Sequence, residues 1–595
     1  MGESSRRRLQ LIAALLGLAA LFIIATLINM QVFKHQFYKE WGEDVRSKAI
    51  PINTPPRGTI TDRNGHVLAG NAVAYTLQAS PREIPESQVI TAAIQLGEIL
   101  ARPSSEIEPY LRWTGDPDFF ENWPQRNLNE DEEEDRAPWI RIEKYLSKEV
   151  GEQINDLQLP GISLKPIWER RYPEGELASH LLGFRAVEDE TGFYGVEGFY
   201  DSFLRSTSIT PEIRVDPQQR PVPWEVTNVE LPEAGGSLVL TIDRTIQAIV
   251  EAELENSIEA YQAEGGTIIV MNPQTFEILA SASRPTYNPA QTAGVDDPKR
   301  FVDPAIGDTY EPGSVFKPLT VAAALDSGVV TEETTFVDNG VFEVGGHEIR
   351  NALDQTYGEQ TITDILIHSI NTGAAWLSTQ MGTDTFYSYV QAFGIGDLTE
   401  VDLEGEVVGE LPLPGDYDEW YDSNLGTNSF GQGLTVTPLQ MITAIATIAN
   451  DGTRLKPYVV VKKIEGDGDV LVSEPQVEAQ VVSPQTARTV TEMLVRTVDE
   501  GVTQAQVEGY RIAGKSGTAE IPVPGGYIEE GTIASFVGYG PIPDPEVVIL
   551  VKLDRPQTSR WGGDTAARSF RRLAQQLFTI LGIPPSGTGV AEANR

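Results

Sequence analysis

Hydrophobic and polar positions divide this chain of 595 residues into stretches of different texture. An unbroken apolar run comes first. A region of short hydrophobic stretches among charged and proline-rich ones follows, and then a region of apolar strands and amphipathic helices. The borders between these patterns predict the domain organisation. We divide the chain into a tail at 1–8, a transmembrane anchor at 9–33, a first domain at 34–235, a second domain at 236–580 and a disordered tail at 581–595.

The apolar run at 9–33 contains no charged side chain. At about 1.5 Å per residue, roughly 22 helical residues span about 33 Å, which is enough to cross a bilayer core. A cleaved signal peptide is the alternative, but its apolar region would be only about 7–15 residues long. Arg6, Arg7 and Arg8 precede the run, so the positive-inside rule places the N-terminus in the cytoplasm. We therefore predict a single-pass membrane protein whose bulk is extracytoplasmic.

Strand and helix patterns are clearest in the second domain. Residues 265–283 and 531–556 each read as a pair of apolar strands, and residues 437–452 show apolar spacing near 3.6 that ends at a glycine. Strands at both ends with helices between them predict an α+β domain, in which an antiparallel sheet is flanked by helices. In the first domain, an Asn64-Gly65 turn between two short strand patterns predicts a hairpin.

Composition narrows the classes of partner. The chain has 45 basic and 86 acidic residues, and this net charge of −41 argues against nucleic acid and anionic lipid heads as partners of the body. The absence of cysteine excludes disulfides and zinc-thiolate sites, and the 5 histidines show no metal-ligand spacing, so we predict neither a metal nor a cofactor. The acidic run at 130–135 reads as a solvated loop.

The first candidate for chemistry is YEPGSVFKP, in which Ser314 precedes Lys317 by three residues. Taken alone this spacing is a weak indication, because a helix N-cap serine followed by a surface lysine has it too. Here a Pro-Gly pair ends an extended segment and helical periodicity follows, so Lys317 shares one helix face with Ser314 and can reach its hydroxyl. A lysine can act as a base only if burial or a second cation lowers its pKa from about 10.4.

The segment GYRIAGKSGTAEI supplies such a cation in Lys515. Residues 509–516 also fit the phosphate-binding pattern G-x-x-x-x-G-K-[ST]. However, the interior of that match is bulky, and the prolines that follow it cannot form the helix that a phosphate loop requires. We therefore interpret the segment as an edge strand that presents Lys515 and Thr518 on alternate sides. A third stretch, LIHSINTGAAWL, places Ser369 and Asn371 at a helix-to-turn break, where a turn or cap role is the default.

In this order, Ser-x-x-Lys, Ser-x-Asn and Lys-Ser-Gly-Thr resemble the three motifs of the penicillin-recognising serine acyltransferases. The stretches PPRGTITDRNGHVLA, RRYPEGELASHLLGF and GVEGFYD resemble N-terminal motifs of class B penicillin-binding proteins, and GQGLTVTPLQ is similar to a transpeptidase-domain segment. The resemblance runs from about Thr54 to Phe570. It implies a penicillin-binding transpeptidase domain on an elongated, β-rich N-terminal pedestal, or dimerisation-like, domain.

The resemblance implies a peptidoglycan D,D-transpeptidase that acts on stem peptides ending in D-Ala-D-Ala and is acylated by β-lactams. Ser314 would be the nucleophile, Lys317 its base, Ser369 a proton relay to the departing D-alanine, and Asn371 a holder of the lysine and the peptide amide. Backbone N–H groups of Ser314 and Thr518 would form the oxyanion hole. The strand residues implied in substrate binding are Lys515, Ser516, Gly517 and Thr518.

The family also implies a polytopic membrane glycosyltransferase as a partner. A hydrolase of the D,D-carboxypeptidase or β-lactamase kind and a non-catalytic cell-wall scaffold remain alternatives. Prompt turnover of penicillin would indicate the hydrolase, and stoichiometric acylation would exclude the scaffold. A role in elongation and a role in division both stay open, as does the chemistry of the acyl acceptor.

Overall fold

A computed structural model describes residues 55–585, together with strand β1 (Ser47–Ala49). The residues within 55–585 that it does not describe are 115–138, 188–189, 207–211, 215–233, 294, 296, 417–418 and 524–525. The predicted anchor at 9–33 and the acidic run at 130–135 therefore lie outside the described residues. Among those that are described, no helix has the length and the apolar character needed to cross a bilayer.

The chain divides into two units, Met1–Pro56 with Ser206–Gly235, and Arg57–Arg205 with Gly236–Arg595. In the first unit, β1 pairs antiparallel with β8 (Glu212–Arg214). The second unit is built around a five-stranded sheet in the order β11-β10-β22-β21-β20, in which every pair of neighbours is antiparallel. Its strands are β10 (Gly265–Met271), β11 (Ile278–Arg284), β20 (Ala513–Val523), β21 (Gly526–Gly540) and β22 (Val547–Asp554). The antiparallel sheet predicted from the apolar strand pairs is confirmed.

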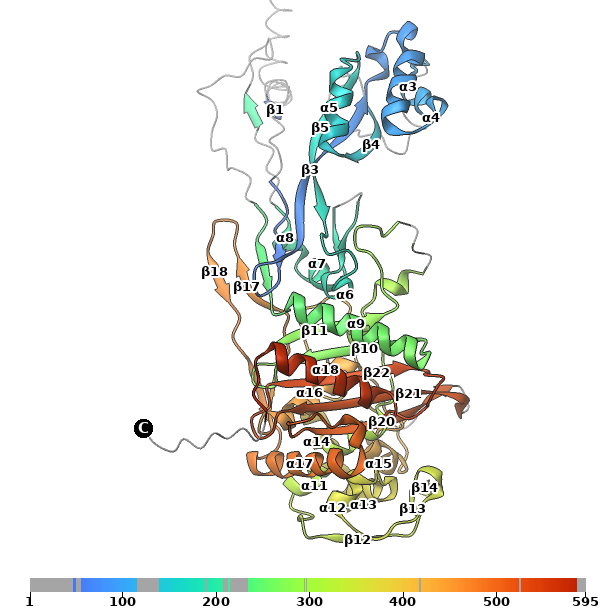
Figure 1. The fold of residues 1–595 in the computed structure, drawn as a ribbon, viewed down its shortest axis with the longest axis vertical. Helices are drawn as coiled ribbons and strands as arrows, with labels where there is room; N and C mark the ends of the chain where they lie inside the picture. Colours follow the sequence, from blue (N-terminus) through green and yellow to red (C-terminus); the bar gives the residue numbers. More distant parts are fainter. Residues whose placement is uncertain are drawn as a thin grey trace, which may run out of the picture. The chain divides into compact units, whose positions relative to one another are not determined.

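Helices cover both faces of this sheet (Figure 1). Ile268 and Val270 of β10 pack in one hydrophobic cluster with α9 (Arg244–Tyr261) and α18 (Ala566–Ile580). Ile269 and Met271, which point to the opposite face, join a second cluster with α16 (Pro438–Ala449) and α17 (Pro484–Arg496). Because both faces are buried, β10 reads as a continuous apolar run and not as an alternating one.

Short elements below this sheet in Figure 1 carry much of the candidate site. The helical ones are the 3₁₀ turn η5 (Gly313–Phe316), α11 (Lys317–Asp326), α12 (Ile362–Ile367), α13 (Asn371–Met381) and α14 (Thr383–Ala392). Two small antiparallel pairs adjoin them, β12 (Thr335–Asp338) with β15 (Gly358–Thr361) and β13 (Val341–Val344) with β14 (His347–Arg350). Helix α16 occupies the helix predicted at 437–452, and it begins in a capping box formed by Thr437 and Gln440.

A second, seven-stranded sheet joins strands from both predicted domains. Its order is β18-β17-β9-β2-β3-β4, with β5 also paired to β3. The strands are β2 (Ile60–Thr61), β3 (Val67–Ala79), β4 (Ile140–Leu146), β5 (Ile162–Arg171), β9 (Ser237–Leu240), β17 (Val460–Ile464) and β18 (Val470–Val472). Strands β2 and β3 form the antiparallel hairpin predicted at Asn64-Gly65. Helices α3 (Glu86–Leu100), α4 (Ser104–Leu111) and α5 (Lys148–Asp156) share a separate hydrophobic cluster with β3 and β4.

Three N-terminal motifs meet in a buried ion cluster. Glu197 on α7 (Gly195–Phe199) is fully buried and accepts hydrogen bonds from Arg57 Nε at 2.7 Å and Arg170 Nε at 2.6 Å. Burial alone would raise the pKa of Glu197, but the attraction of Arg170 and Arg57 outweighs it and holds that pKa below its ordinary value. The two arginines and the glutamate of these motifs therefore contact one another in the folded protein, and this contact accounts for their presence in three separate motifs.

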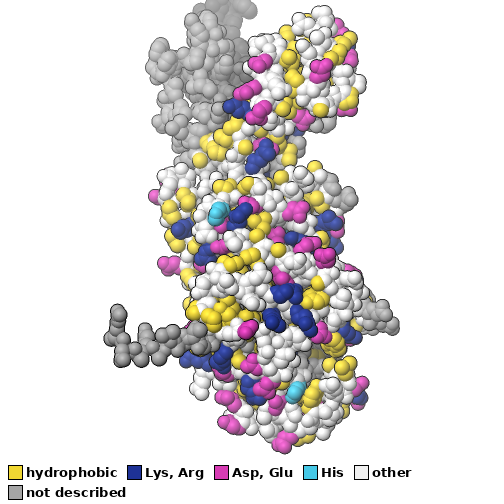
Figure 2. All heavy atoms as spheres, in the orientation of Figure 1, with side chains coloured by type: hydrophobic (Ala, Val, Ile, Leu, Met, Phe, Trp, Pro, Cys, Tyr) yellow, Lys and Arg dark blue, Asp and Glu magenta, His cyan; other side chains and the backbone are white. Residues whose placement is uncertain are grey.

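On the side seen in Figure 2, Asp and Glu side chains are scattered over the surface and do not gather into one patch. A scattered distribution favours solubility over the binding of a specific cationic partner. This agrees with the general interpretation of the net charge of −41.

Removing the charge of Glu197 should destabilise the fold strongly. In Glu197→Gln, the buried Arg170 loses its counter-charge and Arg57 keeps only its ion pair with Asp201, and breaking a buried pair in this way costs about 3–5 kcal/mol. Urea unfolding followed by circular dichroism measures the loss. The control is Glu106→Gln, which removes an exposed ion pair with Arg102 and should change stability by less than about 1 kcal/mol. Equal losses in the two variants would contradict the role given to the cluster.

Candidate active site

Ser314 lies on η5, the turn that leads directly into α11. Gly313, just before it, has φ +59°, a conformation that favours glycine. Its N–H donates to Gly431 O at 3.0 Å, and a Cβ at this position would come within 3.3 Å of the Thr518 carbonyl oxygen. The glycine of the Pro-Gly pair therefore suits a turn that has a positive φ and passes close to strand β20.

Lys317 is fully buried, and its Nζ lies within hydrogen-bond distance of four oxygen atoms. These are Ser314 Oγ at 3.0 Å, Ser369 O at 2.6 Å, Ser369 Oγ at 3.1 Å and Asn371 Oδ1 at 2.8 Å. The carbonyl of Ser369 and the amide oxygen of Asn371 can only accept, whereas a hydroxyl can also donate. A neutral amine would use its two N–H groups on those two acceptors and direct its lone pair at a hydroxyl. This is the arrangement that a general base requires.

The pKa values of the two lysines support this arrangement. Burial lowers the pKa of Lys317 well below its usual value, and the positive charge of Lys515 lowers it further. Burial also lowers the pKa of Lys515, to about 7. Lys515, the second basic group that we predicted from the sequence, therefore lies close enough to Lys317 to lower its pKa.

Ser369 occupies the turn between α12 and α13 with φ +56°. A non-glycine residue in this conformation stores roughly 1–3 kcal/mol of strain. Glycine would relieve that strain but would carry no hydroxyl to contact Lys317 Nζ. Asn371 is oriented by its Nδ2, which donates to Arg350 O at 3.0 Å and so turns Oδ1 toward the lysine.

Residues 515–518 lie on β20, which is the edge strand of the five-stranded sheet, as predicted. Side chains alternate along it, so that Lys515 is buried while Ser516 and Thr518 are half-buried. The Thr518 hydroxyl accepts a hydrogen bond from Gly562 N–H at 3.1 Å, and Lys515 Nζ donates to Ser516 O at 3.0 Å.

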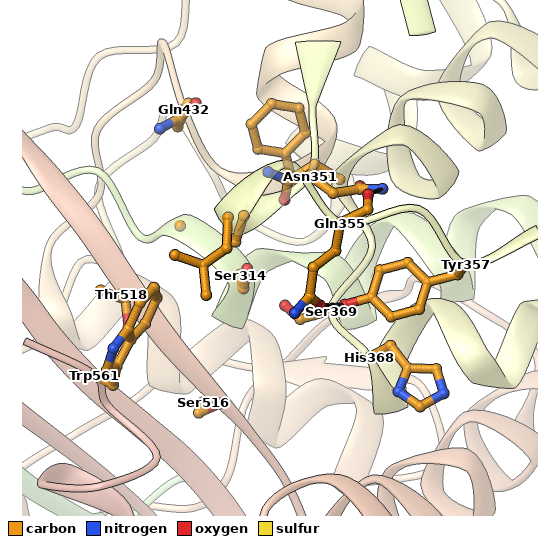
Figure 3. Close-up of a pocket in the computed structure, with 15 residues that line it drawn as sticks. Ser314, Asn351, Gln355, Tyr357, His368, Ser369, Gln432, Ser516, Thr518 and Trp561 are labelled. Atoms are coloured by element: carbon orange, nitrogen blue, oxygen red, sulfur yellow. Dashed lines mark hydrogen bonds between the residues drawn. The ribbon is translucent and has the colours of Figure 1, made fainter. Parts of the chain in front are cut away.

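Ser314, Ser369, Ser516 and Thr518 line one pocket of about 340 Å³. In Figure 3, Thr518 and Trp561 lie on one side of Ser314, and Tyr357 and His368 lie on the other. Asn371 also lines this pocket, whereas Lys317, Lys515 and Gly517 are not among its lining residues. The structure thus brings together the three motifs, with the lysines set beneath the accessible surface.

Much of the pocket wall had not been expected from the sequence. The tyrosine and histidine rings at 357 and 368 stack with centroids 5.2 Å apart and planes 14° from parallel. Two of the unexpected lining residues stand inside stretches singled out in the sequence, His368 in LIHSINTGAAWL and Gln432 in GQGLTVTPLQ, but no role had been predicted for either. The other residues lie outside those stretches. The unexpected lining residues are Asn351, Ala352, Leu353, Gln355, Tyr357, His368, Phe430, Gln432 and Trp561.

Comparison with family models matches both regions of the chain. Residues 266–575 match the penicillin-binding protein transpeptidase domain, and residues 52–240 match the penicillin-binding protein dimerisation domain. These matches cover the α+β region with the pocket and the N-terminal region with the ion cluster.

Individual relatives extend over nearly the whole chain. Stage V sporulation protein D of Bacillus subtilis is 32% identical over 98% of this chain and 86% of its own length. Peptidoglycan D,D-transpeptidase FtsI of Escherichia coli is 30% identical over 99% of this chain and 94% of its own length. Among solved structures, penicillin-binding protein 3 of Mycobacterium tuberculosis in complex with aztreonam has a TM-score of 0.67 and 26% identity, covering 90% of this chain and 98% of that one.

Replacing Lys515 by methionine should shift the pH dependence of Ser314 acylation upward. With Lys317 as the predicted base, acylation requires its amine without the proton, so the rate should rise with pH through the pKa of Lys317. Losing the nearby charge of Lys515 raises that pKa. The rate of labelling by a fluorescent penicillin, measured from pH 5 to pH 9, reports the shift. Lys456→Met, which removes a lysine paired with Glu400 away from the pocket, should leave the profile unchanged. If the rise of the labelling rate with pH occurs at the same pH or at a lower pH in Lys515→Met, the charge of Lys515 does not lower the pKa of Lys317.

Proposed function

This chain belongs to the class B penicillin-binding proteins, and we infer from that membership and from its pocket that it is a peptidoglycan D,D-transpeptidase. It cross-links stem peptides that end in D-Ala-D-Ala through a serine acyl-enzyme and releases D-alanine. The observation that carries this function is the 3.0 Å contact between Lys317 Nζ and Ser314 Oγ in surroundings that favour the neutral amine. β-Lactams acylate the same serine.

In the acylation step, Ser314 Oγ attacks the carbonyl carbon of the penultimate D-alanine while Lys317 accepts the hydroxyl proton. The backbone N–H groups of Ser314 and Thr518 stabilise the negative oxygen that develops. The close passage of η5 and β20, where a Cβ at position 313 would lie 3.3 Å from the Thr518 carbonyl oxygen, supports this pairing of donors from two segments.

Collapse of the tetrahedral intermediate requires a proton for the departing amine. Ser369 Oγ, 3.1 Å from Lys317 Nζ, is placed to relay that proton from the lysine. Asn371 holds the lysine through Oδ1. Its amide nitrogen carries two hydrogens, one of which is donated to Arg350 O, so the second is free for the peptide carbonyl.

The C-terminal carboxylate of the stem peptide binds along β20. The hydroxyls of Ser516 and Thr518 line the pocket, and Lys515 supplies positive charge from within the protein. Gly517 keeps the strand close-packed, because a Cβ there would lie 2.5 Å from Ser535 Oγ. An amine of a neighbouring strand then attacks the acyl-enzyme, and the cross-link forms as Ser314 recovers its proton.

We also propose the membrane arrangement from the sequence. Residues 9–33 form a transmembrane anchor behind a cytoplasmic tail at 1–8, residues 34–235 form the pedestal, and residues 236–580 form the extracytoplasmic transpeptidase domain. The anchor and the pedestal contact a polytopic glycosyltransferase that polymerises the glycan. Digestion of the body by a protease added outside spheroplasts tests the orientation.

Ser314→Ala should abolish labelling by a fluorescent penicillin while the protein stays folded. Lys317→Ala should slow labelling at least about 100-fold, the usual share of proton transfer in such a step. Ser327→Ala is the matched control, because Ser327 follows the end of α11 and its hydroxyl donates to Ala324 O, away from the motif residues. Label retained on Ser314→Ala would identify another nucleophile, and rapid release of hydrolysed penicillin from the unmodified protein would indicate a hydrolase.

A further inference from the structure

Glu311 is a buried carboxylate that the proposed reaction does not use. It lies three residues before the nucleophile and is only 5% exposed. Among the described residues, no lysine, arginine or histidine forms an ion pair with it. Its recorded partners are the Gly433 N–H at 3.0 Å and the Tyr527 hydroxyl, at 3.3 Å from each carboxylate oxygen. A buried charge with only neutral donors is costly, so a buried residue of this kind needs an explanation.

The two donors come from two separate segments, each of which is close in sequence or in the sheet to residues that line the pocket. Gly433 ends the segment 431–433, in which Gln432 lines the pocket and Gly431 O accepts the N–H of Gly313 at 3.0 Å. Tyr527 lies at the start of β21, where it pairs with Pro522 of β20. Strand β20 carries Thr518, so both donors belong to segments that face the nucleophile.

Glu311 therefore connects three parts of the chain that are distant in sequence. The turn that carries Ser314 continues directly from it, the segment 431–433 contacts that turn again at Gly313, and the β20–β21 hairpin contacts it through Tyr527. A shift of either donor segment would change the separation of the Ser314 and Thr518 backbone N–H groups. Small displacements of this kind matter, because an oxyanion hole depends on donors placed about 2.7–3.1 Å from the oxygen.

We propose that Glu311 is a positioning residue for acylation, whose carboxylate holds the segment 431–433 and the β20–β21 hairpin against the turn that carries the nucleophile. The inference rests on the proposed function, since it assumes that Ser314 and Thr518 act together on the acyl donor. Glu311 acts through these segments and does not touch the substrate.

The hydrogen bonds that Glu311 accepts from Gly433 and Tyr527 depend on pH, because the carboxylate can take up a proton. Burial raises the pKa of Glu311 to about 6, the hydrogen bonds from Gly433 and Tyr527 oppose that rise, and the charge of Glu520 adds to it. The titratable groups that face Glu311 are thus Tyr527 and Glu520. Below pH 6 the protonated acid offers one oxygen as a donor and accepts less strongly, so the two segments are held less firmly. Acylation should therefore fall as the pH decreases through about 6.

The test uses Glu311→Gln and Tyr527→Phe in the full-length protein, with the acylation rate constant for a fluorescent penicillin measured from pH 5 to pH 9. Glu311→Gln imitates the protonated acid. We expect acylation at pH 7.5 to be about tenfold slower, the loss expected of one hydrogen bond to a charged acceptor. The variant should also lack the additional fall in rate that Glu311 causes near pH 6, so that its pH profile shows the titration of Lys317 alone. Tyr527→Phe removes a single hydroxyl from a side chain that is 40% exposed, so it should fold normally and show a smaller loss in the same direction.

Glu406→Gln is the matched control. Glu406 is also a half-buried carboxylate whose pKa burial raises, but it accepts hydrogen bonds from Thr399 outside the pocket. It should keep the rate and the pH profile of the unmodified protein. The proposal is overturned if both Glu311→Gln and Tyr527→Phe keep them too, or if Glu311→Gln slows acylation but its rate has the same pH dependence as that of the unmodified protein. Complete labelling at a slower rate separates this effect from failure of the proposed function, in which Ser314→Ala would still be labelled.

Discussion

The proposed chemistry of this protein depends on a buried amine, that of Lys317, whose surroundings lower its pKa. Lys317 is fully buried beside a second buried lysine, and each contact of its Nζ is with an oxygen of the motifs. Exposing the Lys317 amine to solvent would return its pKa toward the ordinary value. In the proposed mechanism, Ser314 would then lack a base. The start of α11, the strained turn at Ser369 and the edge position of β20 all serve this one requirement.

The sequence was informative where chemistry and local structure coincide. Ser314 and Lys317 could be placed on one face because a helix dictates which neighbours meet, and the edge strand at 515–518 followed from its glycines and the prolines after it. The antiparallel sheet was predictable from apolar strand pairs at both ends of the domain. Each of these features is encoded by residues close together in the chain. The structure confirms that Ser314 and Lys317 share a face, that 515–518 lie on an edge strand and that the sheet is antiparallel.

Other features depend on contacts that no local pattern contains. Trp561, Tyr357 and Gln432 reach the pocket from separate loops, and their positions follow from packing of the whole domain. Glu311 stands inside a motif that drew attention to its serine and lysine, yet its contacts with Gly433 and Tyr527 span more than 100 residues.

The seven-stranded sheet has a practical meaning for anyone who wishes to produce the catalytic part alone. Strand β9 begins at Ser237, just after the predicted border, and it pairs in parallel with β2 through Ile60 and Leu238. A fragment cut at residue 236 would lose that neighbour and leave backbone donors and acceptors open beside newly uncovered apolar side chains. Such an edge invites self-association, so a well-behaved fragment should retain the chain from Arg57.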